Sequence, residues 1–274
     1  MNLLEQAFQS EDDQPFLWQA GSKAALFVHG FPATPAEMRP LASVLHEQGW
    51  TVQAILLPGF GPEIATIGRR RYTQWVAAIQ VALTNLQQAY DPVLLVGHSL
   101  GGGLTLQVAA TQPPSGLVLL APFWTLGHLY WPFLPILKRL FSEVHPFRWF
   151  KPDFQGPELR TTIASILPDH DPDDPATQQA VRDLAIPMNT VDQIRSAGQM
   201  TYRLASKVKV SSLVVQGTRD DVVKPTHTRR LVQQIPGQLQ YVEIEAGHDL
   251  INPDTDAWSQ ITHTVTDFAE TFTI

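Results

Sequence analysis

The chain has 274 residues, 44% hydrophobic and 16% charged, which is enough to bury one large core or a core with an inserted subdomain. Its formal net charge is -7 and its basic residues form no run longer than Arg69-Arg70-Arg71, so we expect no nucleic-acid partner. The absence of cysteine excludes disulfides, thiolate metal sites and cysteine nucleophiles. The N-terminal residues lack a signal-peptide pattern, and no apolar run reaches the roughly 18 residues of a membrane span. We therefore expect a cytoplasmic protein without an integral membrane segment.

Short apolar runs alternate with helical patterns along the first half of the chain. The run Ala24 to Val28 has no polar alternation, which is typical of a strand in a sheet covered on both faces. A helix start follows, because Thr34 can cap it, Pro35 suits its first position, and Glu37 stands where a capping box needs a carboxylate. In chain order we expect strands at 24–28, 52–57, 93–96 and 117–120, and helices at 35–46, 72–90 and 100–111.

The same alternation resumes near residue 208. We expect strands at 212–216 and 239–244 there, with helices at 225–235 and 254–272. Strands that alternate with helices favour an α/β fold, with a mostly parallel central sheet flanked by helices on both faces.

The alternation stops between residues 123 and 207. This stretch is rich in proline and aromatic residues, and Asp174-Pro175 has the pattern of a helix start. We interpret 123–207 as an inserted, mainly helical cap or lid, with residues 1–122 and 208–274 forming the core.

One serine has the sequence context of a nucleophile. The segment Gly97-His98-Ser99-Leu100-Gly101 has the form G-x-S-x-G and lies between a predicted strand and a predicted helix. On such a tight turn the serine hydroxyl points out of the sheet, and the helix N-terminus favours a developing negative charge. The alternative is a glycine-rich loop whose serine only caps the helix.

A serine nucleophile needs a base, and the base needs a carboxylate to orient it. His248 follows the predicted strand 239–244 in a short loop, which places it over the same edge of the sheet as Ser99. The carboxylate should follow the strand 212–216, where Asp220 and Asp221 are both candidates. Spacing alone does not choose between these two aspartates.

Backbone amides complete the predicted site. The strand 24–28 ends at His29-Gly30-Phe31, so the N–H groups of Phe31 and Leu100 are the candidate oxyanion hole. We expect His29 to hold this loop by hydrogen bonds. We expect His98 to support the site without acting as its base, because its side chain should point away from that of Ser99.

Several segments together resemble the α/β-hydrolase superfamily, and within it the bacterial carboxylesterases and monoacylglycerol-lipase-like enzymes. They are HGFPATPAEMRPLA (29–42), LPGFG (57–61), GHSLGG (97–102), QGTRDDVVKP (216–225) and AGHDL (246–250). The resemblance implies an α/β-hydrolase fold outside the cap. It implies Asp220 as the acid, because the family's acid loop usually reads D-x-x-V-x-P. Phe60 departs from the family's usual LPGHG and puts only local loop packing in doubt.

These residues predict a serine hydrolase that forms an acyl-enzyme and needs no metal or cofactor. The apolar cap favours a small-molecule carboxylic ester with a short-to-medium acyl chain, as for a carboxylesterase or monoacylglycerol lipase. The candidate pocket residues are Phe123, Trp124, Trp131 and Phe133, although the cap's aromatic residues would equally form its own core. We expect at most transient contact with a lipid surface, and a monomer or dimer.

Two alternatives remain open from the sequence. The same triad would also act on a thioester, an amide or a carbon–carbon bond. A hydrolase fold retained as a non-catalytic binding module normally lacks a triad residue, whereas Ser99, Asp220 and His248 are all present here.

Overall fold

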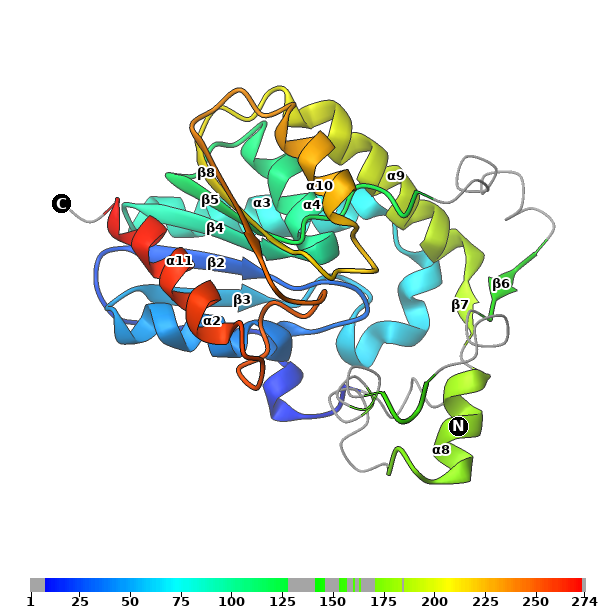
Figure 1. Ribbon diagram of the computed structural model, residues 1–274. Coiled ribbons are helices and arrows are strands. Elements are labelled where there is room, and N and C mark those ends of the chain that lie inside the picture. Colours follow the sequence, from blue (N-terminus) through cyan, green and yellow to red (C-terminus); the bar gives the residue numbers. More distant parts are fainter. Residues whose placement is uncertain are drawn as a thin grey trace.

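The centre of the molecule is a seven-stranded sheet (Figure 1). The computed structural model describes residues 8–127, 141–145, 153–156, 160, 163, 171–183 and 185–272. The strand order is β1-β3-β2-β4-β5-β8-β9, in which only β1 runs antiparallel to its neighbour. The strands are β1 (Phe16–Trp18), β2 (Ala24–Val28), β3 (Thr51–Ile55), β4 (Val93–His98), β5 (Gly116–Leu120), β8 (Ser211–Gly217) and β9 (Leu239–Ile244). The predicted mostly parallel α/β sheet is therefore confirmed.

Helices cover both faces of this sheet (Figure 1). One face carries α2 (Pro35–Glu47) and α11 (Trp258–Glu270), and the other carries α3 (Tyr72–Ala89), α4 (Ser99–Ala109), α9 (Met188–Ala205) and α10 (Pro225–Val232). Strand β2 shows how the sheet separates two apolar layers. Leu26 and Val28 pack into one core cluster, whereas Ala25 and Phe27 pack into the other. A strand buried on both sides has no polar face, which is why the sequence reads as a continuous apolar run.

The N-terminal part of the fold differs from the sequence analysis at two points. Strand β1 was not predicted, because three residues on a sheet edge are too few to show a periodicity. At α2, Thr34 caps the helix by accepting from the Ala36 N–H at 3.3 Å. The capping-box interpretation of Glu37 was wrong, since its carboxylate instead accepts from the Gly30 N–H and contacts His98.

The last helix begins later than predicted. The sequence predicts helix from residue 254, but α11 begins at Trp258. Asn252 explains the difference, because its side-chain oxygen accepts from the Asp254 N–H at 2.9 Å and its carbonyl accepts from the Thr255 hydroxyl at 2.9 Å. Such an Asx turn holds the backbone in a conformation that competes with helix.

Residues 123–207 are described in part. The predicted helix start is confirmed, because α8 (Pro175–Arg182) begins after Asp174, whose side chain accepts from the Ala176 N–H. Helix α9 packs on α4, where the Gln107 amide donates to the Ala197 carbonyl and to the Thr201 hydroxyl at 3.0 Å. The division of the chain into a core and a cap stays a prediction. The described residues also form the short elements η1 (Glu11–Asp13), η2 (Gly61–Arg69), β6 (Glu143–Val144) and β7 (Ile186–Pro187).

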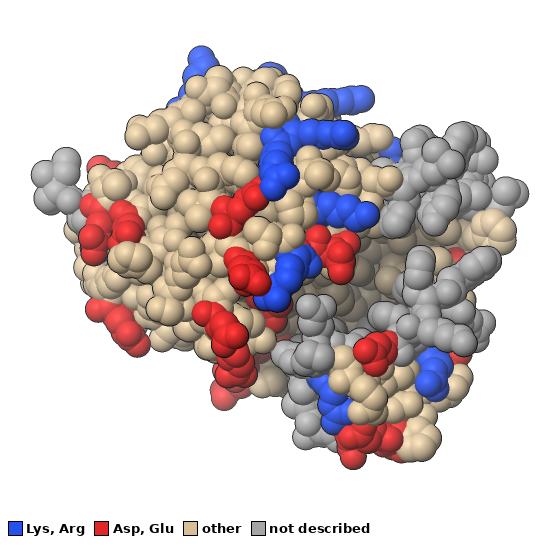
Figure 2. Space-filling model, viewed as in Figure 1, with Lys and Arg blue, Asp and Glu red and all other residues tan. Residues whose placement is uncertain are grey.

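The surface charges and the apolar character of the helices bear on two predictions, that there is no nucleic-acid partner and no integral membrane segment. On the face shown in Figure 2, acidic and basic side chains lie interspersed near the centre, and the described residues form no broad basic field there. Among the described residues, no helix combines the length and the apolar character that crossing a membrane requires.

Candidate active site

Ser99 stands at the junction between β4 and α4, as the G-x-S-x-G pattern predicts. It is the first residue of α4, and its backbone φ of 51° lies in the left-handed region, which residues other than glycine rarely adopt. Such a conformation costs roughly 1 to 3 kcal/mol and persists only where the surroundings impose it. Here the turn presents the serine at the carboxyl end of the central strand and at a helix N-terminus, where the dipole favours negative charge.

The glycines of this turn are required by close packing. A Cβ on Gly97 would lie 2.6 Å from the Thr105 hydroxyl oxygen and 2.7 Å from the Gly101 carbonyl oxygen. A Cβ on Gly101 would collide with the carbonyl oxygens of Val28 and His29. The glycines therefore let α4 approach the end of β2 and the loop that follows it.

We expect Gly101→Ala to destabilise the protein by about 3 kcal/mol, because a backbone collision cannot be relieved by turning a side chain. At an open helical position the same change would stabilise by about 1 kcal/mol, so the sign of the effect tests the packing. The control is Gly49→Ala, where a Cβ meets no atom within 4 Å but φ is 80° and the cost should be about 1 to 2 kcal/mol. Urea unfolding measures both, and equal losses would contradict the collision at Gly101.

The three predicted triad residues lie in one chain of hydrogen bonds. His248 Nε2 is 3.0 Å from Ser99 Oγ, and His248 Nδ1 is 2.8 Å from Asp220 Oδ2. The Asp220 carboxylate can only accept, so Nδ1 carries the proton and Nε2 is free to accept one from the serine. This is the tautomer that a general base needs.

Burial and bonding distinguish the two candidate aspartates. Asp220 is 2% exposed, and its second carboxylate oxygen accepts from the Val222 and Val223 N–H groups at 2.9 and 2.8 Å. Burial alone would raise the pKa of Asp220, but the hydrogen bond and charge of His248, together with the Val223 N–H, hold that pKa below its ordinary value. Asp221 is exposed and has no such contacts with His248.

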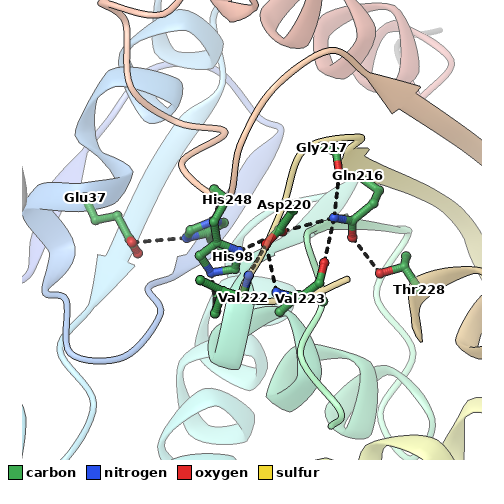
Figure 3. A network of polar contacts seen from close by, with 10 residues as sticks. Glu37, His98, Gln216, Gly217, Asp220, Val222, Val223, Thr228 and His248 are labelled. Atoms are coloured by element: carbon green, nitrogen blue, oxygen red, sulfur yellow. Dashed lines mark hydrogen bonds and ion pairs between the residues drawn. The ribbon is translucent and has the colours of Figure 1, made fainter. Parts of the chain in front are cut away.

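Gln216 belongs to the hydrogen-bond network around Asp220, although the sequence did not single it out. Its side-chain amide donates at 3.0 Å to Asp220 Oδ2 and at 3.0 Å to the Val223 carbonyl, while its oxygen accepts from the Thr228 hydroxyl (Figure 3). The residue is fully buried at the end of β8. Its polar side chain directly after the apolar run Leu213 to Val215 was the available signal, since buried amides are normally hydrogen-bonded.

The candidate oxyanion loop lies directly against Ser99. A Cβ on Gly30 would be 3.1 Å from the Ser99 Cβ, so the backbone that leads to Phe31 passes beside Ser99. Leu100 is the second residue of α4, and amides in the first turn of a helix have no partner within the helix. The structure therefore brings both predicted amide donors to the neighbourhood of Ser99.

Two buried histidines flank this loop and make different sets of hydrogen bonds. His29 donates from Nδ1 to the Gly30 carbonyl at 2.9 Å and accepts the Leu57 N–H at Nε2, so its ring is neutral. Burial lowers the pKa of His29. His98 instead contacts two acceptors, Glu37 Oε1 and the His248 carbonyl oxygen, each at 3.1 Å. The predicted hydrogen bonding of the loop by His29 is confirmed, whereas a supporting role of His98 in the site stays a prediction.

Two of the four candidate pocket residues fall within the described part of the chain. Phe123 donates its N–H to the Ser99 carbonyl at 2.9 Å and is 5% exposed. Trp124 stacks on Tyr202 with ring centroids 4.5 Å apart and donates its indole N–H to the His227 carbonyl. Trp131 and Phe133 lie outside the described residues. Among described residues, no cluster of three or more His, Asp or Glu side chains has an arrangement suited to a metal ion.

Relatives agree with the family resemblance seen in the sequence. A thermostable monoacylglycerol lipase of Bacillus sp. (strain H-257) is 36% identical over 100 residues, which are 36% of this chain and 40% of that protein. A carboxylesterase of Bacillus subtilis (strain 168) is 30% identical over 106 residues, which are 38% of this chain and 43% of that protein. The matched segments thus span about two fifths of each curated relative.

Solved structures and a family profile cover far more of the chain. A structure of the metagenome-derived lipolytic enzymes LipS and LipT matches with a TM-score of 0.76 and 19% identity, over 95% of this chain and 98% of that one. The monoacylglycerol lipase of Paleococcus ferrophilus matches with a TM-score of 0.65 and 18% identity, over 94% and 98%. At these identities the likeness establishes the fold alone, and it confirms the α/β-hydrolase fold. The profile of the family described as serine aminopeptidase, S33, matches residues 20–254, so the chain belongs to that family of α/β hydrolases.

Proposed function

We propose that this protein is a serine ester hydrolase that cleaves carboxylic esters through Ser99, His248 and Asp220. The observation that carries the proposal is the unbroken chain of contacts from Asp220 Oδ2 through both nitrogens of His248 to Ser99 Oγ. A hydroxyl is a poor nucleophile on its own, and this arrangement supplies a base already held in the required tautomer.

The reaction has two steps. In the first, Ser99 Oγ bonds to the ester carbonyl carbon while its proton passes to His248 Nε2, and the Phe31 and Leu100 N–H groups bind the oxyanion. The intermediate collapses when the carbon–oxygen bond to the alcohol breaks and His248 returns the proton to the departing oxygen. In the second, water bonds to the acyl carbon while His248 accepts its proton; the bond from that carbon to Ser99 Oγ then breaks, His248 returns the proton to Oγ, and the acid leaves. The Asp220 carboxylate stabilises the imidazolium in both steps.

The proposed substrate is an ester with an apolar, short-to-medium acyl chain. The names of the curated relatives, a monoacylglycerol lipase and a carboxylesterase, support an ester over other acyl compounds. The position of Phe123 supports an apolar lining, because its backbone bonds directly to that of Ser99. We propose that Trp124, Trp131 and Phe133 extend this lining within a cap of residues 123–207.

A panel of acyl compounds tests the proposal. We expect p-nitrophenyl esters from acetyl to palmitoyl to show a maximum in kcat/KM at or below octanoyl, with palmitoyl lower by about tenfold or more. The panel includes the matching acyl thioester and acyl anilide, which measure the two alternative leaving groups. Faster turnover of the thioester or the anilide than of the ester would reject an esterase, and no turnover of any compound would favour a binding module.

A further inference from the structure

His98 lies between two acceptors that belong to distant parts of the chain. Its Nδ1 is 3.1 Å from Glu37 Oε1 on α2, and its Nε2 is 3.1 Å from the backbone carbonyl oxygen of His248. Neither a carboxylate nor a carbonyl oxygen can donate, so both ring nitrogens must carry hydrogen for both bonds to form. The geometry therefore calls for an imidazolium, buried at 3% exposure and paired with the Glu37 carboxylate.

Glu37 extends the same connection to the oxyanion loop. Its other oxygen, Oε2, accepts the Gly30 N–H at 2.8 Å, and Gly30 directly precedes the candidate oxyanion donor Phe31. In Figure 3 the Glu37 side chain reaches toward His98 from the side of the site opposite Gln216 and Thr228. Asp220 and Gln216 orient the His248 ring, whereas Glu37 and His98 contact the backbone around the site.

We propose that Glu37 and His98 form a charged positioning pair that fixes the oxyanion loop, the nucleophile turn and the His248 loop relative to one another. Glu37 and His98 together connect Gly30 to the backbone of His248, and His98 directly precedes Ser99. An error of about 1 Å in such an alignment costs about 100-fold in rate, so the pair should affect kcat more than KM. This inference rests on the proposed ester hydrolysis.

The charge state of the pair has its own pH dependence. Burial lowers the pKa of His98, but the charge and hydrogen bond of Glu37 and the His248 carbonyl outweigh burial and raise that pKa to about 9. The titratable groups that face His98 are Glu37 from α2, and His248 and Asp249 from the loop before α11. Glu37 in turn faces His29. A pKa raised on folding keeps the cation through neutral pH and loses it as the pH rises through 9. One of the two His98 bonds must then break.

Two substitutions at Glu37 separate hydrogen bonding from charge. Glu37→Gln can still accept the Gly30 N–H, and its amide can donate to Nδ1 of a neutral His98 whose Nε2–H still reaches the His248 carbonyl. Glu37→Ala removes both contacts. At pH 7.5, we expect Glu37→Ala to lower kcat about 10- to 100-fold with KM changed less than about threefold, and Glu37→Gln to recover most of the loss.

The pH profile gives a second readout that a purely structural role would not move. Between pH 8 and 10, kcat of the wild type should fall as His98 loses its proton, whereas Glu37→Gln should stay flat because its His98 is already neutral. The matched control is the exposed pair His263 and Asp267 on α11, whose atoms are 3.3 Å apart. His263→Gln and Asp267→Asn should leave kcat and its pH profile unchanged.

The measurements distinguish failure of this inference from failure of the esterase proposal. The kinetics use the most active p-nitrophenyl ester, and the rate of covalent labelling of Ser99 by a fluorophosphonate is measured in parallel. If the wild type is labelled but hydrolyses no ester, the esterase proposal fails and the labelling rates alone decide the inference. The inference is overturned if Glu37→Ala reacts as fast as the wild type. It is equally overturned if a folded Glu37→Gln is as slow as Glu37→Ala, or shows the wild-type fall above pH 9.

Discussion

Ser99→Ala is expected to lower kcat for the best ester by at least about 10⁴-fold, with little change in the stability of the fold. The reason is that His248 Nε2 then has no hydroxyl at 3.0 Å from which to accept a proton, and water is the only remaining nucleophile. The oxyanion amides remain, so some rate above the background should persist. Steady-state hydrolysis and fluorophosphonate labelling both measure the loss.

The controls for this variant use the strain at the same position. Ser99→Gly should be equally inactive but more stable than Ser99→Ala by about 1 kcal/mol, because glycine adopts a φ of 51° without a Cβ penalty. Ser259→Ala, at an exposed position on α11, should retain full activity. A Ser99→Ala variant that hydrolyses esters at the wild-type rate would show that another residue is the nucleophile.

The elements that position the site follow from local patterns in the sequence. Strand β4 is an apolar run that ends in Gly97 and His98, and Gly97 and Gly101 leave the room that the tight turn into α4 requires. Strand β2 and the loop at Gly30 were predictable in the same way, from an apolar run followed by a glycine. These features are predictable because burial on both faces and close backbone approach each restrict the residue types at consecutive positions.

The network around the triad is less predictable, because its partners are remote in sequence. Glu37 has the spacing of a helix cap, yet its carboxylate contacts His98, 61 residues away. The residues near Glu37 in the sequence give no sign that His98 competes for its carboxylate. Gln216 is unpredictable for the same reason, because its side chain hydrogen-bonds at once to Asp220, Val223 and Thr228. Polar networks of this kind are specified by the assembled fold rather than by any single segment.

The loop after β8 that carries Asp220 and Asp221 was predictable only in part. Its position after β8 follows from the strand pattern, but the spacing in the sequence leaves Asp220 and Asp221 equivalent. The family resemblance implies Asp220, and the folded loop gives the physical reason, because it turns Asp220 inward to bond His248 and leaves Asp221 in solvent. A substitution at each position therefore tests the assignment directly.

Asp220→Asn is expected to lower kcat by about 10⁴-fold, whereas Asp221→Asn should change it less than about twofold. Asparagine nearly matches aspartate in shape, so the Val222 and Val223 N–H groups keep an acceptor. If that oxygen stays with those two amides, the new NH₂ group faces His248 Nδ1 and favours the tautomer with the proton on Nε2. A proton there prevents His248 from accepting the one on Ser99, although the positions of all three side chains are preserved.

Comparing kcat of Asp220→Asn with kcat of Asp221→Asn identifies the acid more reliably than either variant alone. Asp220→Asn should keep the wild-type KM and a cooperative melting transition, because the side-chain volume stays nearly the same and only the two contacts at Oδ2 change, those with His248 Nδ1 and with the Gln216 amide. Fluorophosphonate labelling of Ser99 should slow in parallel with kcat, because both need the same proton transfer. A large loss in Asp221→Asn with activity retained in Asp220→Asn would reverse the assignment of the acid. Equal and modest losses in both would mean that neither carboxylate sets the tautomer, and that the contact at 2.8 Å between Asp220 and His248 is not required for the reaction.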